Sequence, residues 1–272
     1  MTYFQSIILG IIQGVSEFLP ISSSGHLVLA PYLFGWDIQP REAYIFDVLV
    51  QVATLTAVII YYWKDLVTIL QAFISNLLSG TPFQDPDSRL GWFLLLSTIP
   101  AGLAALLLKD TLESSFSNPK YAAIFLLVTS LTLLTGELVG KRRRELESLT
   151  WVDSLIIGLF QVLALFPGVS RSGSTITGGL LRNFDRKSSA RYSFLMAVPV
   201  MSAAGVLAIY DLIKSPLLIK NLPVYLAGFI TSAIVGYLAI RWFISYLSRK
   251  SLYLFAVYCA LVGLSFLVVM LT

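Results

Sequence analysis

The sequence predicts an all-α polytopic membrane protein, with six transmembrane helices plus two re-entrant helix-loop-helix hairpins in an inverted repeat. Three observations lead to this fold class. Only 12% of the 272 residues are charged, about half the share of an ordinary soluble chain. Apolar runs of bilayer-crossing length recur along the chain. Two further apolar runs are interrupted by proline, glycine and hydroxyl residues at equivalent places.

Six uninterrupted apolar runs predict the spanning helices. A helix rises about 1.5 Å per residue, so about 20 apolar residues cross the hydrocarbon core of a bilayer. The predicted spans lie near 44–63, 91–108, 121–139, 192–210, 223–243 and 252–271.

Two broken apolar runs, about 7–33 and about 152–180, predict the re-entrant hairpins. Pro20 and Pro167 disfavour helix at the residue before them, and each intact half is too short to cross a bilayer. Non-helical backbone at membrane depth is tolerated only inside protein or beside water. We therefore expect each run to enter and leave the membrane on one side.

A shift of 148 positions aligns much of the second half of the chain with the first. It pairs Gly10 with Gly158, Gln13 with Gln161, Phe18 with Phe166, Ser22 with Ser170, Ser24 with Ser172, Gly25 with Gly173, Phe46 with Phe194, Val50 with Val198, Val58 with Val206 and Tyr62 with Tyr210. We predict a first repeat, 1–140, and a second repeat, 141–272, each with one hairpin and three spans. Because three is odd, the second repeat is inverted, and a site is expected near the midplane where the repeats meet.

The basic residues predict the orientation in the membrane. Of the 19 Lys and Arg residues, 13 fall on one side of the predicted spans, including the run Lys141–Arg144. Five fall on the other side: Arg41, Lys109, Lys120, Lys214 and Lys220. The richer side is expected to be cytoplasmic. We therefore predict a multi-pass protein of the bacterial inner (plasma) membrane, with both termini and the mouth of the first hairpin on the periplasmic side.

The composition excludes several classes of site. The chain contains one cysteine, Cys259, and one histidine, His26, so a disulfide framework, a thiolate metal site and any site with two imidazoles are excluded. The net charge of +4 is a topology signal and does not indicate nucleic-acid binding. The first 13 residues lack the basic start of a cleaved signal peptide.

Glu17 is the first candidate for chemistry, because a carboxylate at membrane depth is costly and marks a functional site by default. It lies in the last turn before Pro20, near the negative end of a half-helix, so a cation is expected nearby. Arg171 and a bound metal ion are the candidates. Gln13, one turn earlier, projects from the same helix face. A purely structural ion pair between Glu17 and Arg171 is the alternative.

The first hairpin also supplies hydroxyl groups and an imidazole. Ser22, Ser23, Ser24 and Gly25 would form an anion site if a half-helix begins there, since its free N–H groups face the ligand. Helix capping and close packing by small residues are the alternative. His26 has an ordinary pKa near neutral pH and is a candidate general base or acid, the alternative being a structural histidine.

The second hairpin contains a candidate phosphate clamp. The guanidinium of Arg171 is planar and suits phosphate oxygens. The hydroxyls of Ser170, Ser172 and Thr175, with Gly173 between them, complete an oxyanion cradle at a helix start. Together the hairpins supply an acid, a base, a nucleophile and a clamp, which are the components of phosphoryl transfer.

The two motifs resemble the signatures of the undecaprenyl-diphosphate phosphatase family, also called the bacitracin-resistance protein family. The first motif reads QGVSEFLPISSSGH over residues 13–26, and the second reads PGVSRSGST over 167–175. The resemblance extends over the whole chain. It implies an integral membrane phosphatase that hydrolyses undecaprenyl diphosphate to undecaprenyl phosphate and inorganic phosphate. This reaction recycles the lipid carrier for cell-wall synthesis and confers bacitracin resistance.

The resemblance also implies residue roles and a cofactor. Ser23 corresponds to the proposed nucleophile, Glu17 and His26 to the essential acid and base, and Arg171, with Ser170 and Thr175, to the diphosphate-binding group. A divalent cation, Mg²⁺ or Ca²⁺, is implied. Many members carry glutamate where this chain has Gln13, so a metal site of Glu17 and Gln13 would use a weaker, neutral amide ligand.

Several alternatives remain beside this interpretation. The reaction proceeds either through a phosphoserine on Ser23 or by direct attack of a water that His26 or Glu17 activates. The phosphatidic-acid-phosphatase superfamily shares the Ser-Gly-His and Ser-Arg elements but needs a second histidine, which is missing here. A polyprenyl-phosphate transporter (flippase) would use the same head-group site, but it would not need a nucleophile and a base. A scaffold gives no reason for Arg171 and Glu17 at depth. The oligomeric state is not predicted.

Overall fold

The computed structural model describes residues 1–116, 118–213, 218–219 and 221–270, and within these residues the chain forms helices without a strand. The helices are α1 (Tyr3–Phe18), α2 (Ser23–Leu33), α3 (Pro40–Tyr61), α4 (Trp63–Leu78), α5 (Pro86–Leu107), α6 (Lys109–Phe116), α7 (Pro119–Val139), the 3₁₀ turn η1 (Leu146–Ser148), α8 (Trp151–Leu163), α9 (Arg171–Leu181), α10 (Arg186–Ile213), α12 (Leu222–Leu247) and α13 (Tyr253–Val269).

Four of the described helices, α3, α5, α7 and α12, are long and apolar enough to span a membrane. They confirm an all-helical membrane protein and coincide with the predicted spans near 44–63, 91–108, 121–139 and 223–243. The first three begin at Pro40, Pro86 and Pro119. Proline is favoured at a helix start because the N–H that it lacks would have no partner within the helix at that position. These helices therefore begin a few residues before the predicted spans.

The remaining two predicted spans correspond to α10 and α13. α10 contains the run 192–210, and α13 is a shorter apolar helix of 17 residues within the run 252–271. Lys214 and Lys220, two of the basic residues used to predict orientation, lie outside the described residues, as does Leu271 at the end of the last run.

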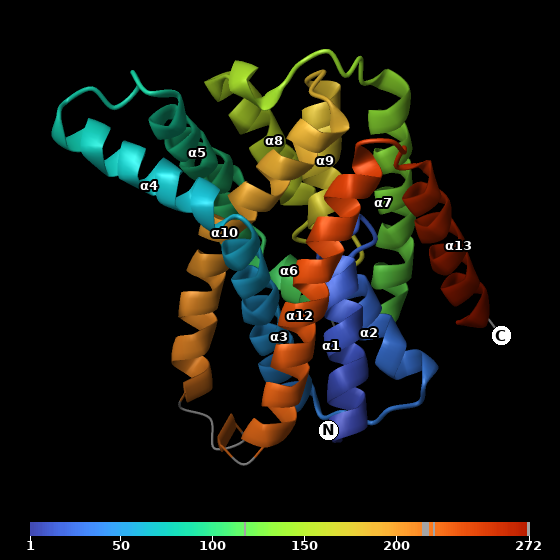
Figure 1. Cartoon of the computed structure of the whole chain (residues 1–272). Coiled ribbons are helices and arrows are strands. Elements are labelled where there is room, and N and C mark those ends of the chain that lie inside the picture. Colours follow the sequence, from blue (N-terminus) through green and yellow to red (C-terminus); the bar gives the residue numbers. More distant parts are fainter. Residues whose placement is uncertain (117, 214–217, 220, 271–272) are drawn as a thin grey trace.

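Two helices, α4 and α6, were not predicted. α4 projects from the body of the molecule (Figure 1) and exposes Leu70, Ile74 and Leu77. These positions are spaced i, i+4 and i+7, which is the apolar stripe of a surface helix. Polar residues on its other face interrupt the apolar run, so a search for uninterrupted spans misses this helix.

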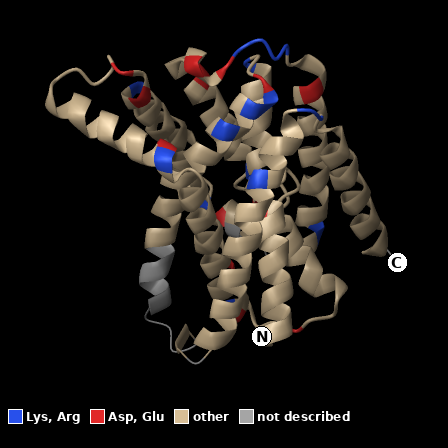
Figure 2. Cartoon of the chain, viewed as in Figure 1, with Lys and Arg blue, Asp and Glu red and all other residues tan. Residues whose placement is uncertain are grey.

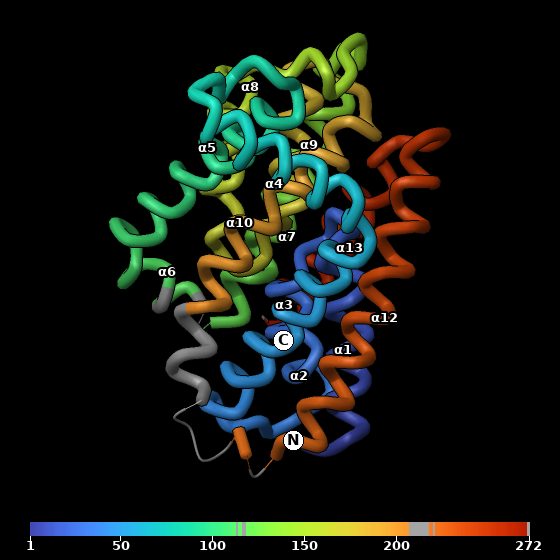
Figure 3. The backbone as a smooth tube through the Cα atoms, turned by 60° about the vertical axis from the view of Figure 1, so that its left-hand side comes forward, coloured from blue at the N-terminus to red at the C-terminus, as the bar shows by residue number. Residues whose placement is uncertain are grey.

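Two pairs of short helices meet at the centre of the molecule. α1 and α2 approach from the end that holds the N-terminus, and α8 and α9 approach from the opposite end (Figure 1, Figure 3). α1 packs mainly on α12, α8 packs mainly on α5, and α7 lies beside both α2 and α9. The broken apolar runs of the sequence thus form two helix–break–helix units whose breaks point towards each other.

Glycine permits the closest of these helix contacts. A Cβ on Gly10 would stand 2.6 Å from the carbonyl oxygen of Gly228, and a Cβ on Gly158 would stand 2.5 Å from that of Ser97. The 148-residue shift relates Gly10 to Gly158, so the α1–α12 and α8–α5 contacts are of one kind. Small residues at a crossing let two helix backbones approach closely within a membrane.

Basic residues gather at the end of the molecule that carries α8 and α9 (Figure 2). Two buried carboxylates bind this end together. Asp153 pairs with Arg144 at 2.7 Å and with Arg182 at 2.6 Å, and Glu137 pairs with Arg186 at 2.5 Å. A buried charge needs such partners to remain ionised. The basic loop after α7 is therefore fixed to the outer ends of α8, α9 and α10.

Candidate functional site

The first helix break lies between α1 and α2, beside Pro20. Ser22 has a φ of 71°, a left-handed value that residues with a side chain rarely adopt. Its Oγ accepts the Gly25 N–H at 3.2 Å and so caps α2. The turn reverses the chain and places Ser23, the first residue of α2, beside Glu17, in the last turn of α1.

The second break, between α8 and α9, carries the same cap. The Oγ of Ser170 accepts the Gly173 N–H at 3.0 Å. Gly168 has a φ of 99°, which favours glycine. Thr129 on α7 donates to the Gly168 carbonyl at 2.8 Å and accepts the Ser170 N–H at 2.9 Å. Thr129 therefore fixes the turn that presents Arg171.

The two breaks contact each other. The Ser172 hydroxyl donates to the Leu19 carbonyl at 3.3 Å, and the Gly168 N–H donates to the Ser24 Oγ at 3.5 Å. A Cβ on Gly25 would lie 3.1 Å from the Gly168 Cα. The two motifs, which are far apart in the sequence, thus form one site.

Glu17 lies at the centre of this site. Its Oε1 accepts from Nη2 of Arg171 at 2.9 Å, and its Oε2 accepts from the Ser23 hydroxyl at 2.6 Å and from the Gln13 amide at 3.0 Å. The Glu17 side chain is 8% exposed and that of Arg171 is 14% exposed, so the ion pair is largely shielded from water. Three donors hold the carboxylate in one position, and the Ser23 hydroxyl points at a base.

The helix ends explain why this pair forms. Glu17 stands in the last turn of α1, where the unpaired carbonyls are negative, and Arg171 begins α9, where the free N–H groups are positive. Each charge is therefore unfavourable on its own helix. Pairing across the breaks brings each charge close to the helix end of opposite sign, so the ion pair also stabilises the contact between the two units.

Gln13 extends the cluster to α3. Its Nε2 also contacts the Thr54 Oγ1 at 3.3 Å, and the Thr54 hydroxyl donates to the Gln51 carbonyl at 2.9 Å. Within the described residues, the buried Oε1 of Gln13 has no hydrogen-bond partner. A buried acceptor without a partner is costly, so this atom is suited to accept a bond from a ligand or to coordinate a cation.

Within the described residues, His26 makes no hydrogen bond to this carboxylate. Its Nδ1 lies 2.7 Å from the Ser22 carbonyl oxygen, and its Nε2 lies 2.8 Å from the hydroxyl of Tyr258 on α13. The base in contact with the Ser23 hydroxyl is therefore Glu17 in this structure.

The other residues predicted to bind phosphate line the two breaks. Buried among them are Ser22, Gly25, Ser170, Ser172, Gly173 and Thr175. The hydroxyls of the serine and threonine residues in this list already cap a helix or contact other polar groups. For example, the Thr175 hydroxyl donates to the Arg171 carbonyl at 2.8 Å and lies 2.6 Å from the Ser193 Oγ. Ser23, Ser24 and Arg171 are partly exposed, so they are the predicted contacts that a phosphate can reach directly.

The fit of a divalent cation can be judged from these atoms. No group of three or more His, Cys, Asp or Glu residues gathers anywhere in the described part of the chain. Glu17 supplies one carboxylate, and Gln13 supplies an amide oxygen that no described residue contacts by a hydrogen bond. Mg²⁺ is commonly held by one or two carboxylates, with substrate phosphates and water completing its shell. The two residues fit a cation that arrives with a diphosphate.

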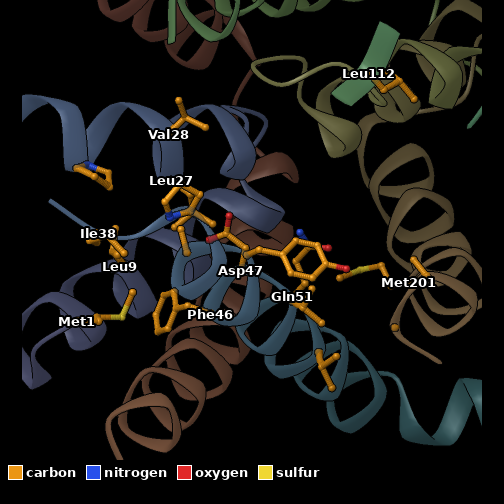
Figure 4. Close-up of a pocket in the computed structure, with 18 of the residues that line it drawn as sticks. Met1, Leu9, Leu27, Val28, Ile38, Phe46, Asp47, Gln51, Leu112 and Met201 are labelled. Atoms are coloured by element: carbon orange, nitrogen blue, oxygen red, sulfur yellow. The ribbon is translucent and has the colours of Figure 1, made fainter. Parts of the chain in front are cut away.

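A cavity of about 750 Å³ opens beside the cluster, towards the end of the molecule that holds the N-terminus. Most of its lining is hydrocarbon, as Figure 4 shows for Phe46 and Met201. Three lining residues stand one helical turn from the cluster: Leu9 on α1, Leu27 on α2 and Gln51 on α3. The cavity therefore lies about one helical turn from the cluster on each of these helices, and none of Glu17, Ser23 and Arg171 lines it.

Asp47 points into this cavity (Figure 4) and was not among the predicted site residues. Within the described residues, its carboxylate makes no hydrogen bond or ion pair. It lies inside the predicted span 44–63, so the rule that singled out Glu17, an acid at membrane depth, also applies to it.

Four further residues at the site were not predicted: Thr54, Thr129, Ser193 and Tyr258. None of them belongs to either motif, and each shares its helix with other hydroxyl residues. No local pattern distinguishes such residues from ordinary helix positions, because their partners come from other parts of the chain.

Comparison with known proteins places the chain in a family. The model of the family described as bacitracin resistance protein BacA matches residues 6–265. This chain belongs to that family. The matched region contains both helix breaks and every residue of the cluster around Glu17, so the site described above lies within the part shared with other bacitracin resistance proteins.

Similar proteins carry the name undecaprenyl-diphosphatase. That of Chlorobaculum parvum is 41% identical over 278 residues, covering 98% of this chain and 97% of the relative. That of Thermomicrobium roseum is 39% identical over 276 residues, covering 99% and 98%. That of Moorella thermoacetica is 42% identical over 258 residues, covering 95% and 94%. The similarity to these bacitracin resistance proteins thus extends over essentially whole chains.

Proposed function

We propose that this member of the bacitracin resistance protein family is an undecaprenyl-diphosphatase. It hydrolyses undecaprenyl diphosphate to undecaprenyl phosphate and inorganic phosphate, which renews the lipid carrier for cell-wall synthesis and confers bacitracin resistance. The observation that carries the proposal is the cluster in which Glu17 accepts from both Ser23 and Arg171. A transporter would need the clamp of Arg171 but not a hydroxyl held on a carboxylate.

The cluster supports a route through a phosphoserine. Ser23 attacks the terminal phosphorus as its hydroxyl proton passes to the Oε2 of Glu17, 2.6 Å away. The bond from that phosphorus to the bridging oxygen breaks, and undecaprenyl phosphate leaves. Water then attacks the phosphorus of the phosphoserine, the bond from that phosphorus to the Ser23 Oγ breaks, inorganic phosphate leaves, and the proton held by Glu17 returns to the Ser23 oxygen. Arg171 has five N–H donors, so it can bind phosphate oxygens while it remains paired with Glu17.

The cavity beside the cluster supports a position for the substrate. Its apolar walls suit the first isoprene units of the lipid chain, and the diphosphate then lies one helical turn further, at Ser23 and Arg171. The remainder of the lipid extends between helices into the bilayer.

A divalent cation, Mg²⁺ or Ca²⁺, is proposed as cofactor. Glu17 and the Oε1 of Gln13, which has no hydrogen-bond partner among the described residues, would hold it together with the diphosphate. When bound, it would neutralise charge on the phosphate oxygens.

The proposed topology has six spans and two re-entrant hairpins, with the two repeats inverted. The end of the molecule rich in Lys and Arg (Figure 2) would face the cytoplasm. The N-terminus and the cavity, at the other end, would then face the periplasm, as would the C-terminus. Labelling of single cysteines introduced at residue 2 and at residue 143, in a Cys259→Ala background, tests this orientation in intact cells.

Phosphate release from undecaprenyl diphosphate by the purified protein in detergent tests the function. We expect release by the wild type, suppression by EDTA, and loss in Glu17→Ala and Arg171→Ala. Ser23→Ala is expected to lose release as well; a variant that kept most of it would instead indicate direct attack by water.

A matched control is Glu147→Ala, which removes an exposed carboxylate at the far end of the molecule and is expected to leave release unchanged. A folded wild type that released no phosphate would refute the phosphatase function.

A further inference from the structure

Tyr258 contacts the only histidine of the chain from outside both motifs. Its hydroxyl lies 2.8 Å from the Nε2 of His26, and the two rings lie within 10° of parallel with their centroids 5.7 Å apart. On the opposite side of the imidazole, Nδ1 lies 2.7 Å from the carbonyl oxygen of Ser22. The ring is therefore held at both nitrogens, by the first helix break and by α13.

These two contacts determine where the imidazole carries its proton. A carbonyl oxygen only accepts hydrogen bonds, so the Nδ1 of His26 must be the donor. In the neutral ring the other nitrogen is then unprotonated, and Nε2 accepts the hydroxyl of Tyr258. His26 thus adopts the Nδ1–H tautomer, with the lone pair of Nε2 directed at the Tyr258 hydroxyl on α13.

The neighbour of Tyr258 fixes α13 against the helix break. The thiol of Cys259 donates to the carbonyl oxygen of Pro20 at 3.7 Å. Further along α13, a Cβ on Gly263 would stand 2.8 Å from the Ala123 carbonyl oxygen of α7. These two contacts hold α13 beside the first helix break and α7, where the Tyr258 ring meets His26.

We propose that Tyr258 is a positioning residue that selects the Nδ1–H tautomer of His26 and holds the imidazole in one orientation beside the first helix break. The proposal rests on the phosphatase function above. A phenol oxygen both donates and accepts. Its hydroxyl donates to Nε2 in the neutral ring, and its oxygen accepts from Nε2–H after protonation. The hydrogen bond therefore persists in both protonation states and keeps the imidazole oriented throughout the reaction.

Tyr258→Phe tests the proposal because phenylalanine keeps the ring and removes only the hydroxyl. With ¹⁵N-labelled histidine, NMR of the purified protein reports one imidazole, since the chain contains one histidine. We expect the wild type to show the Nδ1–H tautomer and the variant to show a mixture of both tautomers. Loss of one hydrogen bond should lower kcat about tenfold and leave KM unchanged, because the diphosphate contacts remain.

Tyr253→Phe is the matched control. Tyr253 lies on the same helix with a similar exposure, 40% against 39% for Tyr258, and it makes no hydrogen bond to His26 within the described residues. This variant should change neither the NMR signals nor kcat. A general disturbance of α13 would affect both variants alike, which would refute a specific role for Tyr258.

Three outcomes for Tyr258→Phe would overturn the proposal: unchanged imidazole signals, a changed tautomer with unchanged kcat, or a raised KM with unchanged kcat. The tautomer is read without substrate. A wild type that showed the expected tautomer but released no phosphate would therefore refute the phosphatase function rather than the hydrogen bond.

Discussion

Glu17 and Arg171 stand 154 positions apart in the chain, and their side chains form an ion pair with Nη2 2.9 Å from Oε1. This pair joins the two helix–break–helix units at their centres. The same carboxylate holds the Ser23 hydroxyl. The carboxylate that pairs the two units is therefore also the base that holds the proposed nucleophile.

Two substitutions of Arg171 should distinguish the contribution of its positive charge from that of its planar arrangement of donors. Arg171→Ala removes the phosphate clamp and is expected to lower kcat by about 10²- to 10³-fold, as does loss of one preorganised donor elsewhere. Arg171→Lys keeps the charge but lacks the planar fork, so its kcat should lie between that of the wild type and that of Arg171→Ala. Steady-state phosphate release measures both.

Arg191→Ala is the control for these variants. Arg191 is 38% exposed and pairs with Asp65 at 3.3 Å, and an exposed ion pair contributes about 0–1 kcal/mol. Its loss should leave kcat within about twofold. Near-normal turnover in Arg171→Ala would contradict a role of Arg171 in binding the phosphates.

Gln13→Glu should increase the dependence on a divalent cation. The change replaces an amide that donates to Glu17 at 3.0 Å with a second carboxylate. Without a cation the two like charges repel, and with a cation they bind it more tightly. We expect the cation concentration for half-maximal phosphate release to fall about tenfold, with less residual activity in EDTA.

Gln71→Glu, on the exposed face of α4, adds the same charge far from the cluster and should leave the cation dependence unchanged. An unaltered cation titration in Gln13→Glu would exclude Gln13 from the proposed metal site.

Adding a methyl group at Gly10, by the substitution Gly10→Ala, should lower the stability of the protein. A Cβ there would stand 2.6 Å from the backbone oxygen of Gly228, so Gly10→Ala must move α1 away from α12. Overpacking of this kind costs about 1–3 kcal/mol. Thermal unfolding in detergent, followed by tryptophan fluorescence, should show a lower midpoint.

Gly102→Ala provides the comparison, because among the described residues no atom from outside its own stretch of helix lies within 4 Å of the added Cβ. It should be neutral or stabilising by up to about 1 kcal/mol through helix propensity. Equal midpoints for the two alanine variants would show that the α1–α12 contact is looser than described.

Asp153→Asn should destabilise the end of the molecule that carries the basic loop. The side chain of Asp153 is fully buried between Arg144 and Arg182, and removing one partner from a buried pair costs about 3–5 kcal/mol. Both arginines are partly exposed, so the loss should be near the lower value. Limited proteolysis after Lys and Arg should become faster at residues 141–144.

Glu147→Gln removes an exposed carboxylate from the same region and should leave the proteolysis rate unchanged. Resistance of Asp153→Asn to proteolysis would mean that the loop is held by other contacts.

The apolar runs predicted most of the helices. Three of these helices begin at Pro40, Pro86 and Pro119, a few residues before the predicted spans, because the starts were placed from the apolar runs alone. The amphipathic α4 was missed because its apolar residues recur on one face only, and Asp47 was missed although it is an acid inside a predicted span. Both are local signals, so the sequence contains the information for each.

Among the candidate residues, the motifs located Glu17, Ser23 and Arg171, but not their partners. The choice between Arg171 and a metal as the cation beside Glu17 could not be made from spacing, and the structure forms the ion pair. Spacing also could not distinguish His26 from Glu17 as the group that contacts Ser23. That difference depends on the φ of Ser22 and on Tyr258, which lies 232 positions after His26.

The sequence by itself determined the membrane class, the two broken helices, their similarity and the family, because each is encoded in residues close together or at a fixed shift. Only the tertiary structure decided which polar atoms meet. At the site, hydrogen bonds of about 3 Å join α1, α2, α3, α7, α9, α10 and α13. Such bonds depend on how helices far apart in the chain pack, and close packing is set by small residues such as Gly10 and Gly158, whose partners no local pattern specifies.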